Sequence, residues 1–309
     1  MPYMSTFANK GPLQKPLVIV VLGPTASGKT DLAIEIALQL NLTIQNIDSR
    51  QLYKGMNIGT AKPSIKQQQS IRHHLLDLRE PNRQITLQEF QFQAMKSIDQ
   101  ALHSRGIALL AGGSGLYIKA IISGFCPPSV SPQTELRAQL KSLGQKTCYS
   151  LLRSADPLSA QLSGEADAIR TQRALEVLYA TGRPISIQKQ NNPPKWKVLE
   201  LGLNPQNLKD RIAERTIQLY QNGLIEETNS LIKAFDKDLP LLQTIGYGEA
   251  LKVISGMLKI EEAIGITIKR TQNFAKRQLT WFRKQHDPTW LNNEDPVRQA
   301  LKLIQSALV

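Results

Sequence analysis

The sequence of 309 residues contains little cysteine and no long apolar run. Its two cysteines, Cys126 and Cys148, form neither a C-x-x-C pair nor a zinc-ligand spacing. This usage indicates no disulfide framework and is typical of a reducing compartment. The first apolar run, Leu17–Leu22, is far too short for a signal sequence or a membrane span. We therefore expect a cytoplasmic protein with no membrane segment, in which the polar residues 1–16 form a loose tail.

Acidic side chains are scarce compared with basic ones. The chain has 25 Asp and Glu against 38 Lys and Arg, which gives a formal net charge of +13. Small-molecule kinases are usually closer to neutrality, so the excess favours an anionic macromolecule as partner, with nucleic acid as the leading candidate. A solvated lysine-rich face would give the same composition, and the charge alone does not decide between them.

What the chain does have is an alternation of strand and helix patterns. Apolar residues recur at helical spacing in some segments, and short apolar runs separate these segments. Repeated strand-helix-strand order predicts a parallel sheet covered by helices. The expected strands are 17–22, 43–47, 75–78, 107–111 and 197–203, and the expected helices are 29–40, 87–105, 211–231 and 249–282.

The pattern changes between residues 127 and 194, where helical segments alternate with Pro and Gly and no strand is convincing. We interpret residues 128–194 as an inserted helical subdomain, and residues 17–127 with 195–309 as the catalytic core. The chain is long enough for one α/β domain with such an insertion. The predicted fold class is therefore α/β, a P-loop NTPase-like parallel sheet with flanking helices and an inserted helical subdomain.

The most specific motif is a phosphate loop of the form G-x-x-x-x-G-K-[ST] at residues 23–30. An apolar strand precedes it and a helix follows it, as the mechanism of the motif requires. The backbone N–H groups and the helix N-terminus would surround an anion. Lys29 would add a positive charge, and the Thr30 hydroxyl would help to hold Mg²⁺. A chance match is disfavoured by these flanking elements, but the loop alone does not identify the phosphate compound.

A second motif begins where the strand at 43–47 ends. Asp48 would lie at the carboxyl end of a strand beside the phosphate loop, where open α/β sheets carry their chemistry. It is our candidate general base, although a helix N-cap or a magnesium ligand would use the same residue type. Thr60 and Lys62, in a glycine-containing loop, could reach the same phosphates.

Eight sequence blocks, taken together, are more specific than any single motif. They are Gly23-Pro-Thr-Ala-Ser-Gly-Lys-Thr30, Asp48-Ser-Arg-Gln-Leu-Tyr53, Gly59-Thr-Ala-Lys-Pro63, His73-His-Leu-Leu-Asp77, Gly112-Gly-Ser-Gly-Leu-Tyr117, Arg173-Ala-Leu-Glu-Val177, Ile245-Gly-Tyr247 and Ala275-Lys-Arg-Gln-Leu-Thr-Trp-Phe-Arg283. In this order the chain resembles the bacterial tRNA dimethylallyltransferase family. A kinase would share only the first block. The chain lacks a Cys/His zinc finger after Trp290, which separates it from the longer eukaryotic form.

The resemblance implies a reaction between dimethylallyl diphosphate and a tRNA anticodon stem-loop. The acceptor would be N6 of the adenosine on the 3′ side of the anticodon, in tRNAs that read codons beginning with U. Asp48 would take the N6 proton, and Mg²⁺, Lys29 and Thr30 would act on the diphosphate leaving group. The enzyme would be a cytoplasmic monomer. The residues expected to bind the diphosphate are Gly23, Pro24, Thr25, Ala26, Ser27, Gly28, Lys29, Thr30, Lys62, Arg270 and Arg277.

The resemblance also implies a set of tRNA contacts. The residues expected to bind tRNA are Asp48, Ser49, Arg50, Gln51, Ser114, Arg170 and Arg173. Ser114 stands where the family usually has Thr, and Ile169 stands where its tRNA-contacting element has Gln, so position 169 carries no expected role. Gln272 replaces a usual Arg, and the neighbouring Arg270 would supply that charge. The adenosine must leave its base stack to react, which costs least in a single-stranded loop.

Other interpretations stay open at the level of sequence. His73 and His74 are a weak metal candidate, because adjacent strand residues face opposite sides. Basic residues of the last long helix favour one cationic face toward RNA and one apolar face, with Phe274, toward the sheet, although a solvated face is the alternative. The competing functions are an adenylate isopentenyltransferase that uses a free nucleotide, a small-molecule kinase and a non-catalytic RNA-binding protein.

Overall fold

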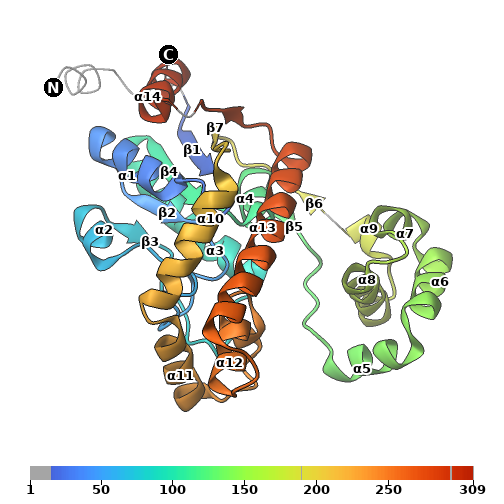
Figure 1. Cartoon of the computed structure of the whole chain (residues 1–309). Helices are drawn as coiled ribbons and strands as arrows, with labels where there is room; N and C mark the ends of the chain where they lie inside the picture. Colours follow the sequence, from blue (N-terminus) through green and yellow to red (C-terminus); the bar gives the residue numbers. More distant parts are fainter. Residues whose placement is uncertain (1–14, 189, 293, 309) are drawn as a thin grey trace. The chain divides into compact units, whose positions relative to one another are not determined.

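The computed structural model describes residues 15–188, 190–292 and 294–308. The chain forms two compact units (Figure 1). The first comprises the residues up to Ile122 and from Lys195 onward, and the second is Ser123–Pro194. Each unit has its own hydrophobic core.

The first unit is built around a six-stranded sheet of order β3-β2-β4-β1-β7-β8, in which every neighbouring pair is parallel. All six residues of the central strand β1 are buried. Such an unbroken apolar run is typical of a strand covered on both faces. The strands are β1 Leu17–Leu22, β2 Ile44–Asn46, β3 His73–His74, β4 Ile107–Gly112, β7 Lys197–Gly202 and β8 Thr289–Trp290.

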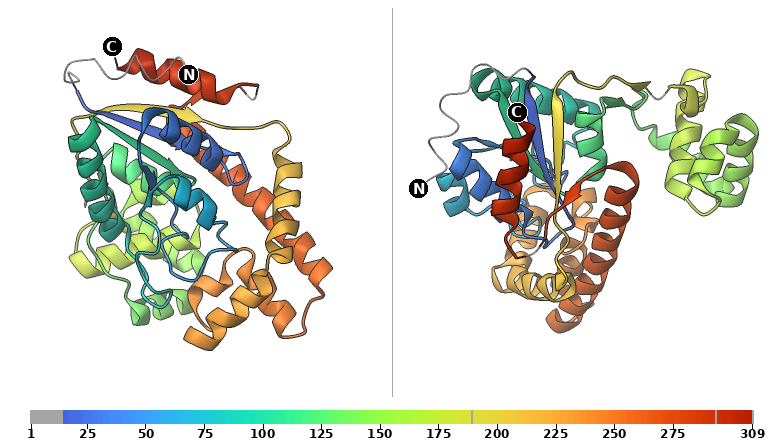
Figure 2. Two further views of the ribbon diagram at one scale, coloured as in Figure 1. Left: turned by 90° about the vertical axis from the view of Figure 1, so that its left-hand side faces the viewer. Right: turned by 90° about the horizontal axis from the view of Figure 1, so that it is seen from above.

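Helices cover both faces of this sheet (Figure 2). Because side chains alternate along a strand, Leu17, Ile19 and Val21 pack in the core with α1 and α14. Val18 and Val20 point to the opposite core, which α3, α4 and α10 to α13 complete. The helices of this unit are α1 Lys29–Leu40, α2 Ile65–Ser70, α3 Leu87–Arg105, α4 Gly115–Ile122, α10 Leu208–Gln221, α11 Leu224–Phe235, the 3₁₀ helix Pro240–Gln243, α12 Tyr247–Ile254, α13 Ile260–Gln285 and α14 Pro296–Ala307.

The second unit is a small helical bundle. Its helices are α5 Thr134–Leu143, α6 Gln145–Ala155, α7 Pro157–Ser163, α8 Ala168–Thr181 and α9 Ile185–Gln188. The two ends of the unit are joined by an antiparallel pair, β5 Phe125–Cys126 with β6 Gln190–Asn191. A further bond from Asn192 N to Gly124 O, 3.0 Å long, extends this pairing. The expectation that this stretch contains no strand was therefore wrong at its end.

Three other element predictions were also wrong. The strand expected at 75–78 lies at His73–His74 instead, because Leu75 and Asp77 have φ values of 64° and 52° that end an extended run. The helix expected at 211–231 is two helices separated at Gly223, whose φ is 99°. The helix expected at 249–282 is likewise divided after Ile254, near Gly256 with a φ of 74°. The parallel sheet with flanking helices is confirmed. None of the helices described here combines the length and apolar character needed to cross a bilayer.

Candidate active site

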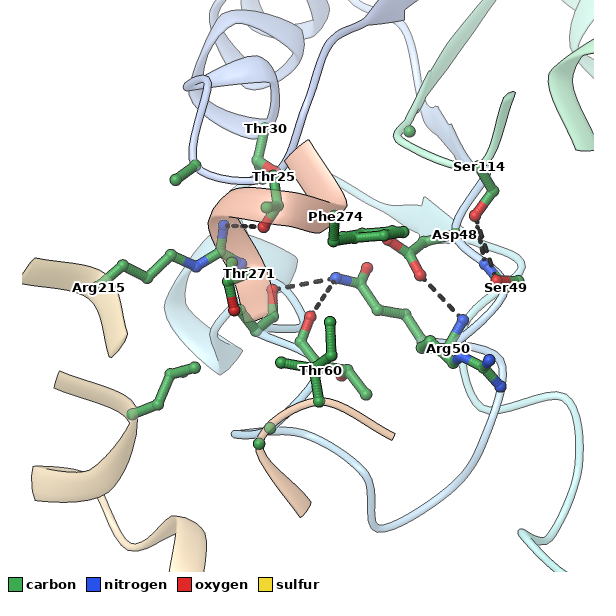
Figure 3. A pocket seen from close by; sticks show the side chains of 18 of the residues that line it. Thr25, Thr30, Asp48, Ser49, Arg50, Thr60, Ser114, Arg215, Thr271 and Phe274 are labelled. Carbon is green, nitrogen blue, oxygen red and sulfur yellow. Dashed lines mark hydrogen bonds between the residues drawn. The ribbon is translucent and has the colours of Figure 1, made fainter. Parts of the chain in front are cut away.

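A cavity of about 360 Å³ lies at the carboxyl ends of β1, β2 and β4 in the first unit (Figure 3). This is the edge at which open parallel sheets bind ligands. One wall is the turn between β1 and α1, a second is the chain that follows β2, and helices α10 and α13 supply the rest. The lining is a mixture of cationic, hydroxyl and apolar side chains, as expected for an amphipathic ligand.

The turn between β1 and α1 is a preformed phosphate loop. Gly28 has a φ of 90°, and a Cβ at Gly23 would lie 2.7 Å from the carbonyl oxygen of Leu203, so both positions require glycine. The Gln278 side chain of α13 forms hydrogen bonds with the loop and with Gly113. Its Oε1 accepts a 2.9 Å bond from Thr25 N, and its Nε2 donates a 2.8 Å bond to Gly113 O.

Two partly buried cations lie at this loop. Lys29 Nζ donates to Pro24 O at 3.2 Å, and Arg215 Nη1 lies 3.4 Å from Thr25 Oγ1 (Figure 3). Burial, followed by the charge of Arg215, lowers the pKa of Lys29 to about 8 despite the opposing effect of Asp48. Burial also lowers the pKa of Arg215. Two neighbouring cations whose charged forms are disfavoured by burial provide an environment that suits an anion with several negative charges.

Sequence reasoning missed Arg215 and Gln278. Arg215 comes from α10, 190 positions away from Thr25, and Gln278 is 253 positions away. One signal was available for the arginine, because Arg211 and Arg215 are four residues apart and lie on one face of a predicted helix. Arg211 donates from Nε to Ala26 O at 2.8 Å and so also supports the loop.

Asp48 lies two residues after the end of β2 and faces the same pocket (Figure 3). Of the described residues that line the pocket, it alone carries a carboxylate. Its Oδ1 accepts a 2.9 Å bond from Arg50 N, which fixes the side chain in a turn. A Cβ at Gly112 would clash with the carbonyl of Ile47, so the glycine allows β4 to approach the residue before Asp48.

Several predicted tRNA contacts gather beside Asp48. Ser114 Oγ accepts a 3.0 Å bond from Ser49 N and lies 3.3 Å from Ser49 Oγ. These residues and Arg50 line the pocket with Asp48. Gln51 lines it too, but its Nε2 donates to Thr60 O and Ala61 O, both at 3.0 Å. The amide nitrogen of Gln51 therefore shapes the adjoining loop.

Lys62, which was expected to contact the diphosphate, binds groups of the protein instead. Only 2% of this side chain is exposed, and Nζ donates to Tyr53 O, Asn57 Oδ1 and Asp77 Oδ1 at 2.9, 2.9 and 2.6 Å. These three bonds use all three ammonium donors. Lys62 stabilises its own loop, and its neighbours Ala61 and Pro63 face the pocket instead.

The helix α13 also differs from expectation. Arg270 lines the pocket, where it forms an ion pair with the buried Glu249. Arg277 is exposed and lies over the ring of Phe274, with Cζ 5.9 Å from the ring centroid. It is absent from the described pocket lining. Phe274 was expected against the sheet, but it is 39% exposed and projects into the pocket (Figure 3).

In the second unit, the predicted tRNA contacts Arg170 and Arg173 have different environments. Arg170 is 58% exposed and lies 3.4 Å from Asp167. Arg173 instead donates to Glu176 Oε2 at 2.6 Å and to the carbonyls of Pro128 and Val130 at 3.3 and 2.9 Å. The guanidinium group of Arg173 is thus bound within the bundle, and the tRNA contact expected of it stays a prediction.

Pocket residues could hold Mg²⁺ only together with a ligand. Among the residues described here there is no group of at least three His, Cys, Asp or Glu that could hold a metal ion. Mg²⁺ usually takes one or two protein oxygens and completes its shell with substrate phosphate and water. The Thr30 hydroxyl and the Asp48 carboxylate, both in the pocket lining, fit that mode. His73 also lines the pocket, without a second such residue to make a histidine metal site.

Lys29 makes anion binding dependent on pH. We expect diphosphate affinity to fall as the pH rises above 8, because the ammonium group, whose pKa is about 8, then loses its proton. The free energy of unfolding should instead rise with pH between about pH 8 and 10.5, since the unfolded chain binds more protons than the folded chain in this range. Calorimetric titration with inorganic diphosphate at several pH values measures the first effect. A Lys29→Gln variant should not show this loss of affinity above pH 8. An equally steep loss in that variant would contradict the role given to Lys29.

Glu176 should control the stability of the second unit. Its carboxylate is buried and accepts bonds from Arg137, from Gln133 N and from Arg173. Glu176→Ala leaves these partners unpaired and should cost about 3 to 5 kcal/mol of unfolding free energy in this unit. Hydrogen exchange should show loss of protection in α8 and unchanged protection in β1. The exposed Glu165→Gln is the matched control, and equal protection in both variants would refute the expectation.

The same carboxylate predicts an acid limit for the second unit. Burial opposes ionisation of Glu176, but hydrogen bonds from Arg137, Gln133 N and Arg173 outweigh it and lower the pKa from 4.5 to about 2. Its stabilising contribution is therefore complete above 4.5 and is lost as the pH falls toward 2.

Comparison with known proteins finds close relatives along most of the chain. A family model described as IPP transferase matches residues 51–285. The chain is 60% identical to the tRNA dimethylallyltransferase of Prochlorococcus marinus strain MIT 9313 over 297 residues, which cover 96% of this chain and 99% of the relative. It is 58% identical to the protein of the same name from Synechococcus sp. strain CC9311, with 98% of each chain covered.

Solved structures give the same grouping. The tRNA isopentenylpyrophosphate transferase of Bacillus halodurans has a TM-score of 0.69 and 31% identity, with coverage of 95% of this chain and 97% of that one. A eukaryotic dimethylallyltransferase described as acting on tRNA has a TM-score of 0.77 and 27% identity. That alignment covers 94% of this chain and 77% of the eukaryotic chain.

Proposed function

Since the chain belongs to the IPP transferase family and is an enzyme that transfers a dimethylallyl group to tRNA, we propose that the pocket of the first unit is where this transfer takes place. The donor in this proposal is dimethylallyl diphosphate. The acceptor is N6 of the adenosine on the 3′ side of the anticodon, in tRNAs that read codons beginning with U.

One observation carries the proposal. Two partly buried cations, Lys29 and Arg215, lie at the predicted phosphate loop in a pocket whose single described carboxylate is Asp48. A transfer of this kind needs an anion site for the leaving group and a base for the acceptor, kept apart in one cavity. Apolar residues of the same lining, including Ile212 and Leu219, would contact the hydrocarbon chain.

The reaction forms one bond and breaks one bond at the same carbon. The adenine N6 lone pair attacks C1 of the dimethylallyl group, and the bond from C1 to the diphosphate oxygen breaks with both electrons leaving on oxygen. Lys29, Arg215 and the N–H groups of the phosphate loop stabilise the charge that develops there. Asp48 accepts the proton that N6 loses. Mg²⁺ held with Thr30 would neutralise further diphosphate charge when bound.

The acceptor side of the proposal includes the basic surface. Arg170 of the second unit and the exposed arginines of α13 supply positive charge for the phosphates of an anticodon stem-loop. Ser49, Arg50 and Ser114 stand beside Asp48, where the flipped adenosine would enter.

A three-part assay tests the function. Radiolabelled dimethylallyl diphosphate is offered with bulk tRNA, with AMP and with no acceptor, and label should enter tRNA only. Transfer to AMP would support the free-nucleotide alternative instead. ATP turnover without tRNA at the rate of a kinase would overturn the proposed donor.

A further inference from the structure

We propose that Glu227 is a positioning residue that fixes one wall of the active pocket from outside it. This inference rests on the proposed function of the pocket. Glu227 lies on α11 and does not belong to the described residues that line the cavity. Its carboxylate nevertheless joins two pocket-lining segments that are far apart in the sequence, the loop at residues 57–61 and the Tyr247 side chain.

The loop contacts Glu227 through consecutive backbone amides. Oε2 accepts bonds from Asn57 N at 2.9 Å and Ile58 N at 2.8 Å. Oε1 accepts bonds from Ile58 N and Gly59 N, both at 3.0 Å. Successive N–H groups that converge in this way form a concave anion site, here filled by a side chain of the protein itself.

The fourth donor is the Tyr247 hydroxyl, which lies 2.6 Å from Glu227 Oε1. Burial raises the pKa of Tyr247, and the neighbouring Glu227 carboxylate raises it further. The phenol therefore stays protonated and donates to Glu227. An ionised carboxylate is an acceptor only, with about four lone-pair sites, so these four donors saturate it.

These bonds bring the loop against the tyrosine ring. Gly59 and Tyr247 both line the pocket, and a Cβ at Gly59 would clash with the Tyr247 ring. The next residues, Thr60 and Ala61, also face the pocket. Glu227 therefore determines where this wall stands relative to the phosphate loop and Asp48.

Other side chains hold the far half of the loop. Lys62 reaches Tyr53 O and the Asp77 carboxylate, and Gln51 reaches Thr60 O and Ala61 O. None of these bonds connects the loop to α11 or to Tyr247. The Glu227 carboxylate makes that connection. Losing it would free the amides of residues 57–59 from α11, while Lys62 still binds the Asn57 side chain and the rest of the loop stays in place.

Glu227→Gln is the sharpest test, because it keeps the shape of the side chain and replaces one acceptor oxygen by an amide donor. That donor would face backbone N–H groups or the Tyr247 hydroxyl. We expect kcat for tRNA prenylation to fall by about 10²-fold, the loss typical of a misplaced wall in an active site. The neighbouring exposed Glu226→Gln is the matched control and should retain wild-type kcat.

Hydrogen exchange separates positioning from general destabilisation. Glu227→Gln should lose amide protection at residues 57–59 and keep wild-type protection in β1 and β4. Loss of protection throughout the sheet would overturn the inference, as would a kcat equal to that of the Glu226 variant. Inactive wild-type enzyme in the same assay would instead refute the proposed function.

A second variant, Tyr247→Phe, tests the role of Glu227 even if Glu227→Gln fails to fold, because its kcat is compared with that of the wild type. Tyr247→Phe removes one donor and leaves the backbone amides bound, so it should lower kcat by less than Glu227→Gln does. Adding Tyr247→Phe to Glu227→Gln should cause no further loss, because the hydroxyl then has no carboxylate to bind. Wild-type kcat in Tyr247→Phe, or independent and multiplicative losses in the double variant, would overturn the shared role of Glu227.

Discussion

Asp48→Asn should lower kcat by on the order of 10² to 10⁴-fold, the usual range for loss of a general base. The asparagine Oδ1 can still accept the bond from Arg50 N, so the turn that follows β2 is preserved. What is lost is the ability to take a proton from N6. Because an exocyclic aromatic amine is a weak nucleophile, the chemical step should slow while tRNA affinity stays near the wild-type value.

Single-turnover kinetics with saturating donor and tRNA measure this loss directly. Asp210→Asn, an exposed carboxylate on α10, is the matched control and should react at the wild-type rate. An unchanged single-turnover rate in Asp48→Asn would remove Asp48 as the base. A large loss of tRNA affinity with normal chemistry would make it a recognition residue.

Arg215→Gln should lower kcat with dimethylallyl diphosphate by about 10² to 10³-fold, the loss usually seen when a donor to a developing anion is removed. Arg215 supplies a partly buried positive charge beside Thr25, and glutamine retains only hydrogen-bonding capacity there. Arg215→Lys should recover part of the rate, since it restores the charge without the planar guanidinium group. Binding of tRNA should persist in both variants.

The pH profile provides an independent check on Arg215. The charge of Arg215 lowers the pKa of Lys29 toward about 8, after the larger effect of burial. Arg215→Gln should therefore move the alkaline loss of diphosphate binding to higher pH. Lys209→Gln, an exposed change on the same helix, should alter neither the rate nor the profile. If Arg215→Gln behaves like Lys209→Gln, Arg215 has no part in diphosphate binding.

Elements with local start and stop signals were predictable from the sequence. The helix predicted at 87–105 has these bounds because Thr86 and Glu89 form a capping box and Gly106, with a φ of 70°, ends the last turn. Strand β1 was predictable from its uninterrupted apolar run. Two predicted helices, 211–231 and 249–282, are each divided in the structure. The signal for the division was also local, since Gly223 and Gly256 adopt positive φ values at the breaks.

The pocket was predictable only where one contiguous segment forms it. The phosphate loop and Asp48 belong to such segments, and both face the cavity. Arg215 and Gln278 contact Thr25 from 190 and 253 positions away, and Glu227 contacts Gly59 from 168 positions away. No local pattern encodes such pairings. Only the folded structure reveals which polar side chain of a helix contacts a pocket loop that is distant in the sequence.

Lys62 and Arg173 have protein partners that the sequence did not reveal. Both are basic residues in blocks that suggested a ligand contact, and the fold uses both internally. Lys62 is saturated by two backbone or amide oxygens and a carboxylate, and Arg173 binds Glu176 with two carbonyls. A basic residue in a conspicuous motif can form hydrogen bonds within the protein as well as with a substrate. The number of protein acceptors around it indicates how many of its donors remain for a ligand.

The pairing of β5 with β6 has an evolutionary consequence. Because Gly124 and Asn192 are hydrogen-bonded to each other, the inserted segment leaves and re-enters the core polypeptide at one place. A short hairpin turn could close that same gap, since antiparallel neighbours need only a tight connection. Such a segment can be gained, lost or exchanged by a single recombination event without rethreading the parallel sheet.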